Sequence, residues 1–290
     1  MTRYVVLDVF TDTAFGGNPL AVIPDATALP EETLQKIARE FGFSETTFVY
    51  PPAEAGHTAR VRIFTPASEI PFAGHPTIGT AVALARDGAA PEMVLELGVG
   101  PIRAWVEGDA ARFVTEVPLT LGAEPEPALV AACAGLDMRD LELARHRPVV
   151  ASVGLPFVLA ELSGHDALAR AAPDRAAFAR AEAAHPTGID LFALLLYVRR
   201  GGEVRARMFA PLINVPEDPA TGSAAAALAA FLASREGDLD LTLHQGLEMG
   251  RPSRIDLSVR GGAVTVGGRA VPVMEGHLVL PGLPANLVTP

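Results

Sequence analysis

The sequence predicts an α+β protein made of two similar domains, each with short strands around a central apolar helix. A strand-like block, RVRIFTP at 60–66, recurs as RARMFAP at 205–211, an offset of 145 residues. A loop block, PTIGTA at 76–81, recurs as PATGSA at 219–224, an offset of 143 residues. Two matched blocks in the same order indicate a duplicated structural unit.

The segment that begins within each loop block is apolar on every face, IGTAVAL at 78–84 and SAAAALAAFLA at 223–233. A helix of this kind that is too short to cross a membrane is buried all round, so we expect each one to run through the middle of its own domain. Pro76 and Pro219 suit the first helical turn, because proline fixes φ there and its missing N–H costs nothing. The residue before each proline would then stand at a helix N-terminus.

The other elements are short and recur through both halves. Apolar or alternating runs bounded by Gly, Pro or Asp predict strands at 4–12, 20–25, 46–51, 60–66, 93–98, 103–108, 111–117, 148–154, 157–162, 193–200, 205–211, 242–246, 254–261 and 263–271. Helix start and stop signals predict surface helices at 30–41, 128–135 and 175–184. The Pro/Glu-rich stretch 118–127 is the expected junction, which gives domains at 1–118 and 119–277, and a strand at 278–290 is expected to complete the first domain.

Composition and charge exclude several classes of partner. The 290 residues (30.3 kDa) are 49% hydrophobic and 20% charged, as in compact globular proteins. The net charge of −11 and the pI near 5.1 argue against nucleic acid and anionic membranes as partners. The sequence has neither an apolar run of membrane-spanning length nor a signal peptide at its start, so we expect a cytoplasmic protein without membrane contact.

Several kinds of active site are also excluded. The single cysteine, Cys133, cannot supply a thiol pair, and the single lysine, Lys36, lies in a helical stretch unsuited to a Schiff base or a phosphate loop. The seven histidines form neither an HxxxH pair nor a Cys/His cluster, so no metal site is expected. The nucleophile motif GxSxG and the dinucleotide motif GxGxxG are both absent.

Acid/base chemistry remains, and its first candidate is Glu45. This residue follows the helix stop at Gly42 and opens an apolar strand. Desolvation among Phe43, Thr46 and Phe48 would raise the pKa of its carboxyl group toward the range that a general acid/base needs. The alternative is a solvated charge in a turn, because Glu is rarely buried.

His75 and Asp218 are the next candidates, because each precedes the proline of an expected central helix. The free N–H groups and the dipole of a helix N-terminus attract carboxylates. The structural alternatives are a hydrogen-bonded loop histidine for His75 and a helix N-cap for Asp218. Ser223 has no visible base to make it a nucleophile, so its hydroxyl is interpreted as a ligand contact or a capping group.

These blocks also carry a resemblance to a known family. MTRYVVLDVFTDTAFGGNPLAVI, SETTFV, RIFTPASEIPFAGHPTIGTA, RMFAPLINVPEDPATGSAAAALAAFLA and HQGLEMGRPSRI, spread in order over nearly the whole chain, resemble the phenazine-biosynthesis isomerases, the PhzF-like proteins. The resemblance implies the diaminopimelate-epimerase-like fold, in which two pseudo-symmetric barrel-like β domains each wrap a central helix and the active site lies in the interdomain cleft. It also implies a homodimer.

The resemblance further implies roles for individual residues. Glu45 would be the proton shuttle, with His75 and Asp218 as supporting acid/base groups. Gly74 and Gly222 would offer backbone N–H groups to a carboxylate, and the other substrate-binding residues would be Ser44, Ser223 and Asn18.

The implied reaction is isomerisation of trans-2,3-dihydro-3-hydroxyanthranilic acid to an aminoketone without a cofactor. Moving a proton between ring carbons needs one carboxyl group that takes the proton and returns it on the same face. Two alternatives stay open, a two-base amino-acid epimerase or racemase and a non-catalytic binder of small carboxylates.

Overall fold

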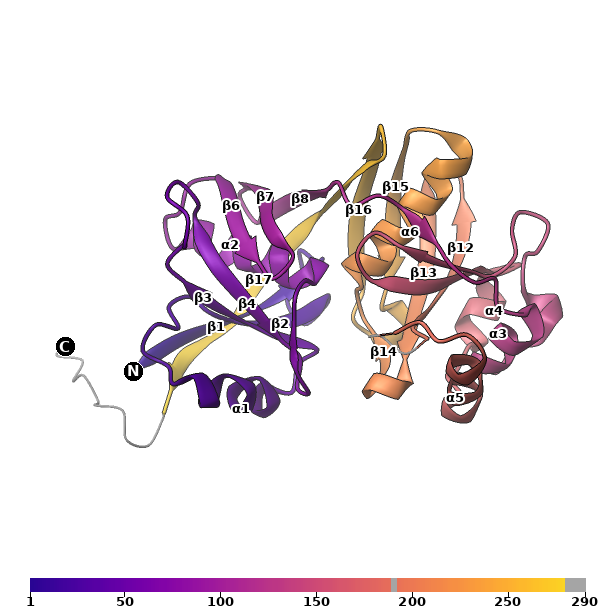
Figure 1. Cartoon of the computed structure of the whole chain (residues 1–290), viewed down its shortest axis with the longest axis horizontal. Coiled ribbons are helices and arrows are strands. Elements are labelled where there is room, and N and C mark those ends of the chain that lie inside the picture. The colour runs from indigo at the N-terminus through magenta and orange to yellow at the C-terminus, as the bar shows by residue number, and fades with distance from the viewer. Residues whose placement is uncertain (189–191, 280–290) are drawn as a thin grey trace. The chain divides into compact units, whose positions relative to one another are not determined.

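The computed structural model describes residues 1–188 and 192–279, and Figure 1 shows its elements. Its internal contacts divide the chain into two compact units. Unit 1 holds residues 1–15, 19–113 and the segment from 269 onward, and unit 2 holds residues 16–18 and 114–268.

Unit 1 is a β-rich body with two helices. Its strands are β1 (Thr2–Val9), all but the first residue of β2 (Asn18–Ile23), β3 (Glu45–Tyr50), β4 (Ala59–Phe64), β5 (Glu69–Ile70), β6 (Glu92–Leu97), β7 (Gly100–Glu107), most of β8 (Ala110–Thr115) and the second part of β17 (Ala263–Leu278). Its helices are α1 (Glu31–Phe41) and α2 (Gly74–Arg86).

Unit 2 carries more helical segments. Its strands are β9 (Thr120–Leu121), β10 (Val149–Ser152), β11 (Pro156–Glu161), β12 (Leu194–Arg200), β13 (Glu203–Ala210), β14 (Val215–Asp218), β15 (Leu239–Gln245), β16 (Ser253–Arg260) and the first part of β17. Its helices are α3 (Pro127–Cys133), α4 (His165–Arg170), α5 (Arg175–Ala184), α6 (Gly222–Glu236) and the 3₁₀ turns η1 (Met138–Asp140), η2 (Pro211–Ile213) and η3 (Leu247–Met249).

The strand pairings of the two units match. In unit 1, β2 is parallel to β3, β3 is antiparallel to β4, and β4 is parallel to β6. In unit 2, β11, β12, β13 and β15 repeat this series with the same directions. The pairings of unit 1 also form a closed ring, since β8 and β1 both pair with β17 and β1 pairs with β2. The predicted α+β class with barrel-like sheets is confirmed.

A helix that is buried on nearly all faces lies against the strands of each unit. In α2 every residue from Gly74 to Ala83 is buried, and in α6 burial extends from Gly222 to Leu232 with Ser223 as the exception. Small residues permit this packing. A Cβ added at Gly79 would lie only 2.5 Å from Cδ2 of Leu20, so α2 approaches the sheet too closely for a larger residue.

Several predictions need correction. Pro76 lies in the first turn of α2, but α6 begins at Gly222, so Pro219 precedes that helix and does not open it. The strand expected at 263–271 runs on to Leu278, because β17 exchanges its antiparallel partner β16 for β1. The contact-based units divide at 113/114 and 268/269, and the domain boundaries at 118/119 and 277/278 stay a prediction. Residues 280–290 of the strand expected at 278–290 lie outside the described residues.

Candidate functional site

Glu45 is placed by the sharp end of the preceding helix. The helix α1 ends at Phe41, and Gly42 takes a left-handed conformation with φ of 67° while its N–H donates to the carbonyl of Ala38. Three residues after Gly42 the chain enters β3, where Glu45 stands opposite Leu20 of the parallel strand β2. Ser44 is the partly buried residue immediately before the strand.

Strand alternation decides which way Glu45 faces. Successive side chains of a strand point to opposite sides, so Glu45 and Thr47 share one face and Thr46 and Phe48 share the other. The Thr47 hydroxyl lies 2.9 Å from the hydroxyl of Thr80, so the face of Glu45 is the one turned to α2. The expected grouping of Glu45 with Thr46 and Phe48 is therefore wrong.

His75 is the partner that the structure brings to Glu45 within unit 1. It occupies the second position of α2, only 4% of its side chain is exposed, and its Nε2 lies 3.5 Å from Oε2 of Glu45. Burial lowers the pKa of His75 to about 3. The contact has the geometry of an ion pair, yet the ring is neutral near pH 7, so we interpret it as a neutral imidazole beside a carboxyl group.

Asp218 ends strand β14 in unit 2, three residues before the helix N-cap at Thr221. The prediction that it stands at the helix N-terminus is wrong, because pairing with Met208 of β13 keeps the backbone extended to this point. Its side chain is buried, and its Oδ1 and Oδ2 accept hydrogen bonds from Nδ2 of Asn18 at 2.9 Å and Oγ1 of Thr221 at 2.5 Å. Burial raises the pKa of Asp218 to about 6, against the effect of these two donors.

Thr221 and Gln245 complete this network and were missed by the sequence reasoning. The Gln245 side chain is fully buried, and its amide donates to the Asp218 carbonyl at 2.7 Å and to Oγ1 of Thr221 at 3.1 Å. Its carbonyl oxygen accepts from the backbone N–H of Thr221 at 3.2 Å. The sequence does contain a signal for Gln245, because it continues the alternation of the inward-facing Leu241 and Leu243. A glutamine at an inward-facing position needs buried polar partners.

Asn18 can contact Asp218 because the short loop at residues 16–18 packs as part of unit 2. Besides Asp218, its Nδ2 donates to the carbonyl of Ala220 at 3.0 Å. The guanidinium of Arg251 donates to the carbonyls of Gly16 and Gly17, each at 2.7 Å. These bonds attach the loop to unit 2 and fix the position of the Asn18 amide.

Gly74 and Gly222 begin α2 and α6, so their backbone N–H groups belong to the first helical turns and have no acceptor within the helix. Ser223 is the partly exposed residue of an otherwise buried first turn. It is not the N-cap, which excludes the capping interpretation for its hydroxyl. The structure thus groups Glu45 with His75 in unit 1, and Asn18 with Asp218 in unit 2.

The described residues contain no group of three or more His, Cys, Asp or Glu side chains that could hold a metal ion. Within the same residues, no helix is long and apolar enough to cross a membrane.

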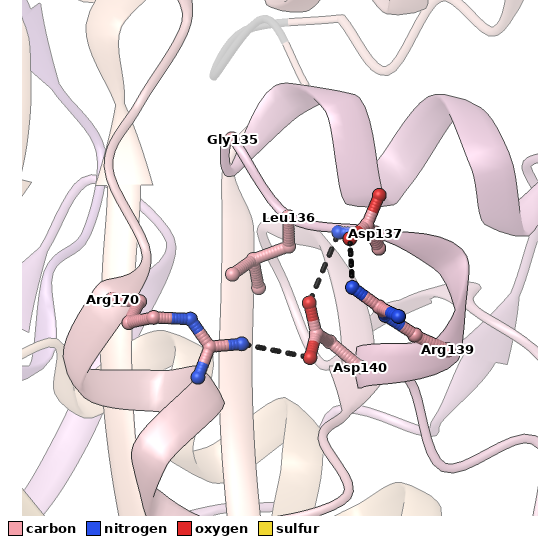
Figure 2. Close-up of a pocket in the computed structure, with 6 residues that line it drawn as sticks. All are labelled: Gly135, Leu136, Asp137, Arg139, Asp140 and Arg170. Carbon is pink, nitrogen blue, oxygen red and sulfur yellow. Dashed lines mark hydrogen bonds and ion pairs between the residues drawn. The ribbon is translucent and has the colours of Figure 1, made fainter.

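A surface depression lies elsewhere in unit 2. It measures about 550 Å³ and is lined by Gly135, Leu136, Asp137, Arg139, Asp140 and Arg170, as Figure 2 shows. Its charges are paired with one another, Arg170 with Asp140 at 2.8 Å and Arg139 with Asp137 at 3.0 Å. None of the predicted site residues lines it.

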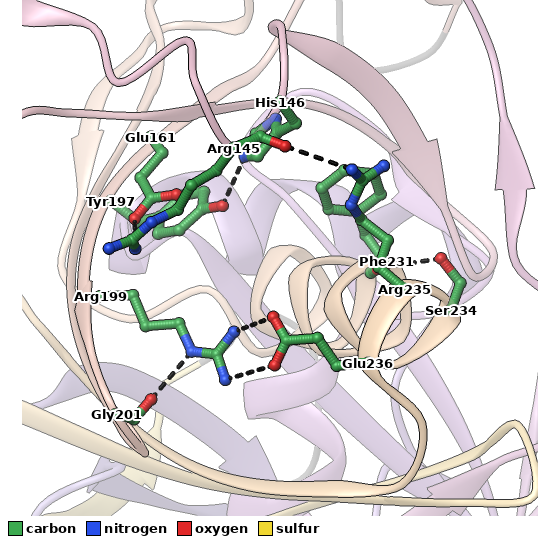
Figure 3. Close-up of polar contacts among 10 residues, drawn as sticks. All are labelled: Arg145, His146, Glu161, Tyr197, Arg199, Gly201, Phe231, Ser234, Arg235 and Glu236. Carbon is green, nitrogen blue, oxygen red and sulfur yellow. Dashed lines mark hydrogen bonds and ion pairs between the residues drawn. The ribbon is translucent and has the colours of Figure 1, made fainter.

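A second polar cluster stabilises unit 2 around the C-terminal end of α6 (Figure 3). The buried Glu161 pairs with Arg145, and Arg199 holds Glu236 through two hydrogen bonds of 2.6 and 2.9 Å. His146 accepts from the Tyr197 hydroxyl at 2.6 Å, because its other ring nitrogen faces a carbonyl and must donate. This cluster joins strands, helix and loop, and none of the predicted site residues belongs to it.

The comparison with known proteins decides the family. Residues 7–276 match the model of the phenazine biosynthesis-like proteins, PhzC-PhzF. The chain belongs to this family. An "uncharacterized isomerase" of Mesorhizobium japonicum is 40% identical, over 96% of this chain and 99% of that protein. The trans-2,3-dihydro-3-hydroxyanthranilate isomerase of Pseudomonas fluorescens is 37% identical, over 97% and 100%. Both of these relatives are named isomerases, and this chain is an isomerase as well.

Solved structures agree with this assignment. The structure of a predicted epimerase from Pseudomonas aeruginosa superimposes with a TM-score of 0.81 at 31% identity, and the match covers 97% of this chain and all of that one. The predicted epimerase-like fold is thereby confirmed.

Proposed function

We propose that the protein is a cofactor-independent isomerase that moves a proton within a small carboxylate. The proposed substrate is trans-2,3-dihydro-3-hydroxyanthranilate, as in phenazine biosynthesis. The observation that carries the proposal is the 3.5 Å approach of the Glu45 carboxyl group to the neutral, buried imidazole of His75. The identity to an isomerase of this name supports the choice of substrate.

Glu45 is the proposed proton shuttle. A carboxylate at the mouth of a strand can take a proton from one ring carbon and return it to another on the same face. The neutral His75 beside it has one nitrogen that donates and one that accepts, so it can pass a proton during the later tautomerisation without carrying a net charge.

The second group of residues has a complementary role in this proposal. With a pKa of about 6, Asp218 exchanges protons near neutral pH, as a supporting acid/base group must. The N–H groups of Gly74 and Gly222 suit a substrate carboxylate, because helix N-termini attract anions. Ser44, Ser223 and Asn18 are proposed to supply the remaining polar contacts.

The test is proton NMR of the substrate with the purified protein in D₂O. We expect the diene signals to disappear and deuterium to enter the ring. Glu45→Gln should slow this conversion by about 10² to 10⁴, the usual contribution of a general acid/base, while substrate binding persists. Glu40→Gln, an exposed position of α1, is the matched control and should keep the wild-type rate. Wild-type turnover in Glu45→Gln would remove Glu45 from the reaction.

The same experiment separates the alternatives. Deuterium at an α-carbon of an amino acid, with loss of chirality, would indicate the two-base epimerase. Tight binding of aromatic carboxylates without solvent exchange would indicate a binding protein.

We also propose that the protein acts in the cytoplasm as a homodimer, a proposal that rests on the family resemblance. Light scattering during gel filtration tests the dimer, which requires twice the chain mass of 30.3 kDa.

A further inference from the structure

Only one assignment of donors and acceptors is consistent with the hydrogen bonds among Asp218, Thr221 and Gln245. The backbone N–H of Thr221 can only donate, so the Gln245 atom that it meets is the carbonyl oxygen, and the Gln245 amino group faces the other way. That amino group has two protons, which reach the Asp218 carbonyl and Oγ1 of Thr221.

The Thr221 hydroxyl is oriented as a result. Its oxygen already accepts from Gln245, so its single proton is left for Oδ2 of Asp218 at 2.5 Å. The Asn18 amide donates to the other carboxyl oxygen. Both oxygens of Asp218 therefore receive a donor, an arrangement that suits a carboxylate better than a carboxylic acid.

A close backbone approach makes this network possible. Gly246, directly after Gln245, has φ of 75°, and a Cβ there would lie 2.6 Å from the carbonyl oxygen of Pro219. Only glycine fits, so the end of β15 can lie against the backbone that follows Asp218.

We propose that Gln245 is a positioning residue which, by orienting the Thr221 hydroxyl, holds Asp218 as a proton acceptor. This inference rests on the proposed function for its catalytic meaning, but the orientation itself can be measured without substrate. Glu217 on the same strand, whose charge also raises the pKa of Asp218, is held by Arg207 through bonds of 2.7 and 2.8 Å. The Arg251 guanidinium donates to the carbonyls of Gly16 and Gly17 in the Asn18 loop.

The test follows the Asp218 carboxyl carbon by NMR during a pH titration of protein labelled with ¹³C-aspartate. The resonance is assigned as the one that Asp218→Asn removes. Loss of a hydrogen bond to a charged group by Thr221→Val should raise the midpoint by about one pH unit, a tenfold change in the ionisation constant. Thr221→Ser should return it toward the wild-type value, because the hydroxyl is restored. Gln245→Met should raise it in the same direction, since the freed hydroxyl can turn away.

Thr115→Val is the matched control, since Thr115 is a buried threonine of unit 2 outside this network, and its midpoint should equal that of the wild type. If Gln245→Met does not fold, the Thr221 pair decides the orientation. An unchanged midpoint in Thr221→Val, or no recovery in Thr221→Ser, would overturn the proposal. Turnover of the substrate with unchanged midpoints would reject the positioning role alone. Shifted midpoints without any turnover would reject the proposed function alone.

Discussion

Replacement of His75 by asparagine should change how the stability of unit 1 depends on pH. In the folded chain burial lowers the pKa of His75 to about 3, whereas the unfolded side chain titrates near 6.5. Between these values the unfolded state binds more protons than the folded state, so the wild-type protein loses stability as the pH falls. The loss begins below pH 6.5 and amounts to about 2 kcal/mol at pH 5, at 1.36 kcal/mol for each unit.

The assay is urea unfolding between pH 5 and 7.5, followed by fluorescence of Trp105. This is the only tryptophan, and it lies on β7 of unit 1, so it reports on the unit that contains His75. We expect the difference in unfolding free energy between His75→Asn and wild type to move by about 2 kcal/mol in favour of the variant as the pH falls from 7.5 to 5. His277→Asn is the control, because His277 is exposed in the same unit.

A difference that stays constant with pH would refute this reasoning. It would mean that the Glu45 carboxylate, 3.5 Å away, stabilises a protonated His75 enough to offset burial. The contact would then be a true ion pair, and the neutral imidazole of the proposed mechanism would have to be abandoned.

Three further predictions follow from local contacts. Gly79→Ala should lower the free energy of unfolding by about 1 to 3 kcal/mol, because the added Cβ would collide with Leu20. Gly164→Ala is the control and should leave the stability unchanged, since the space around Gly164 is open. Thermal unfolding compares the two variants. Arg145→Ala should lower the free energy of unfolding by about 1 to 2 kcal/mol at pH 8, because it leaves the charge of the buried Glu161 unpaired. The loss should be smaller at pH 5, because burial raises the pKa of Glu161 and protonation removes the unpaired charge. Urea unfolding at the two pH values measures this difference. Dialysis against EDTA should leave the isomerisation rate unchanged, since no metal is expected to take part.

The internal repeat predicted two similar units, because repeated sequence blocks in the same order fold into strands in the same order. The blocks at 60–66 and 205–211 became β4 and β13, which have corresponding parallel and antiparallel neighbours in the two units. The long strand β17 was predicted too short because Pro272, directly after the predicted end at Val271, resembles a strand boundary. Only the exchange of pairing partners keeps the chain extended there, and no local pattern contains that information.

The site was predictable in its residue types and less so in its local geometry. Asp218 was identified as a candidate, but the proximity of a proline suggested a helix start that the structure places at Gly222. The short helix α4 was also missed, since six residues carry little periodicity. Gln245 was visible only through strand alternation, and Asn18, which donates to Asp218, lies 200 residues from it in the sequence.

Burial shifts the pKa values of the two candidate acid/base groups in opposite directions. It lowers the pKa of His75 to about 3, so the imidazole is neutral near pH 7, and it raises the pKa of Asp218 to about 6, so this carboxyl group titrates close to neutral pH. His75 lies in the first turn of α2, whereas Asp218 ends β14 three residues before the N-cap of α6, and an unpaired charge buried beside either helix would be costly. The attraction for a substrate carboxylate must then come largely from the backbone N–H groups of the first helical turns. Since those groups do not titrate, substrate binding should vary less with pH than turnover, in which Asp218 is the proposed supporting acid/base group.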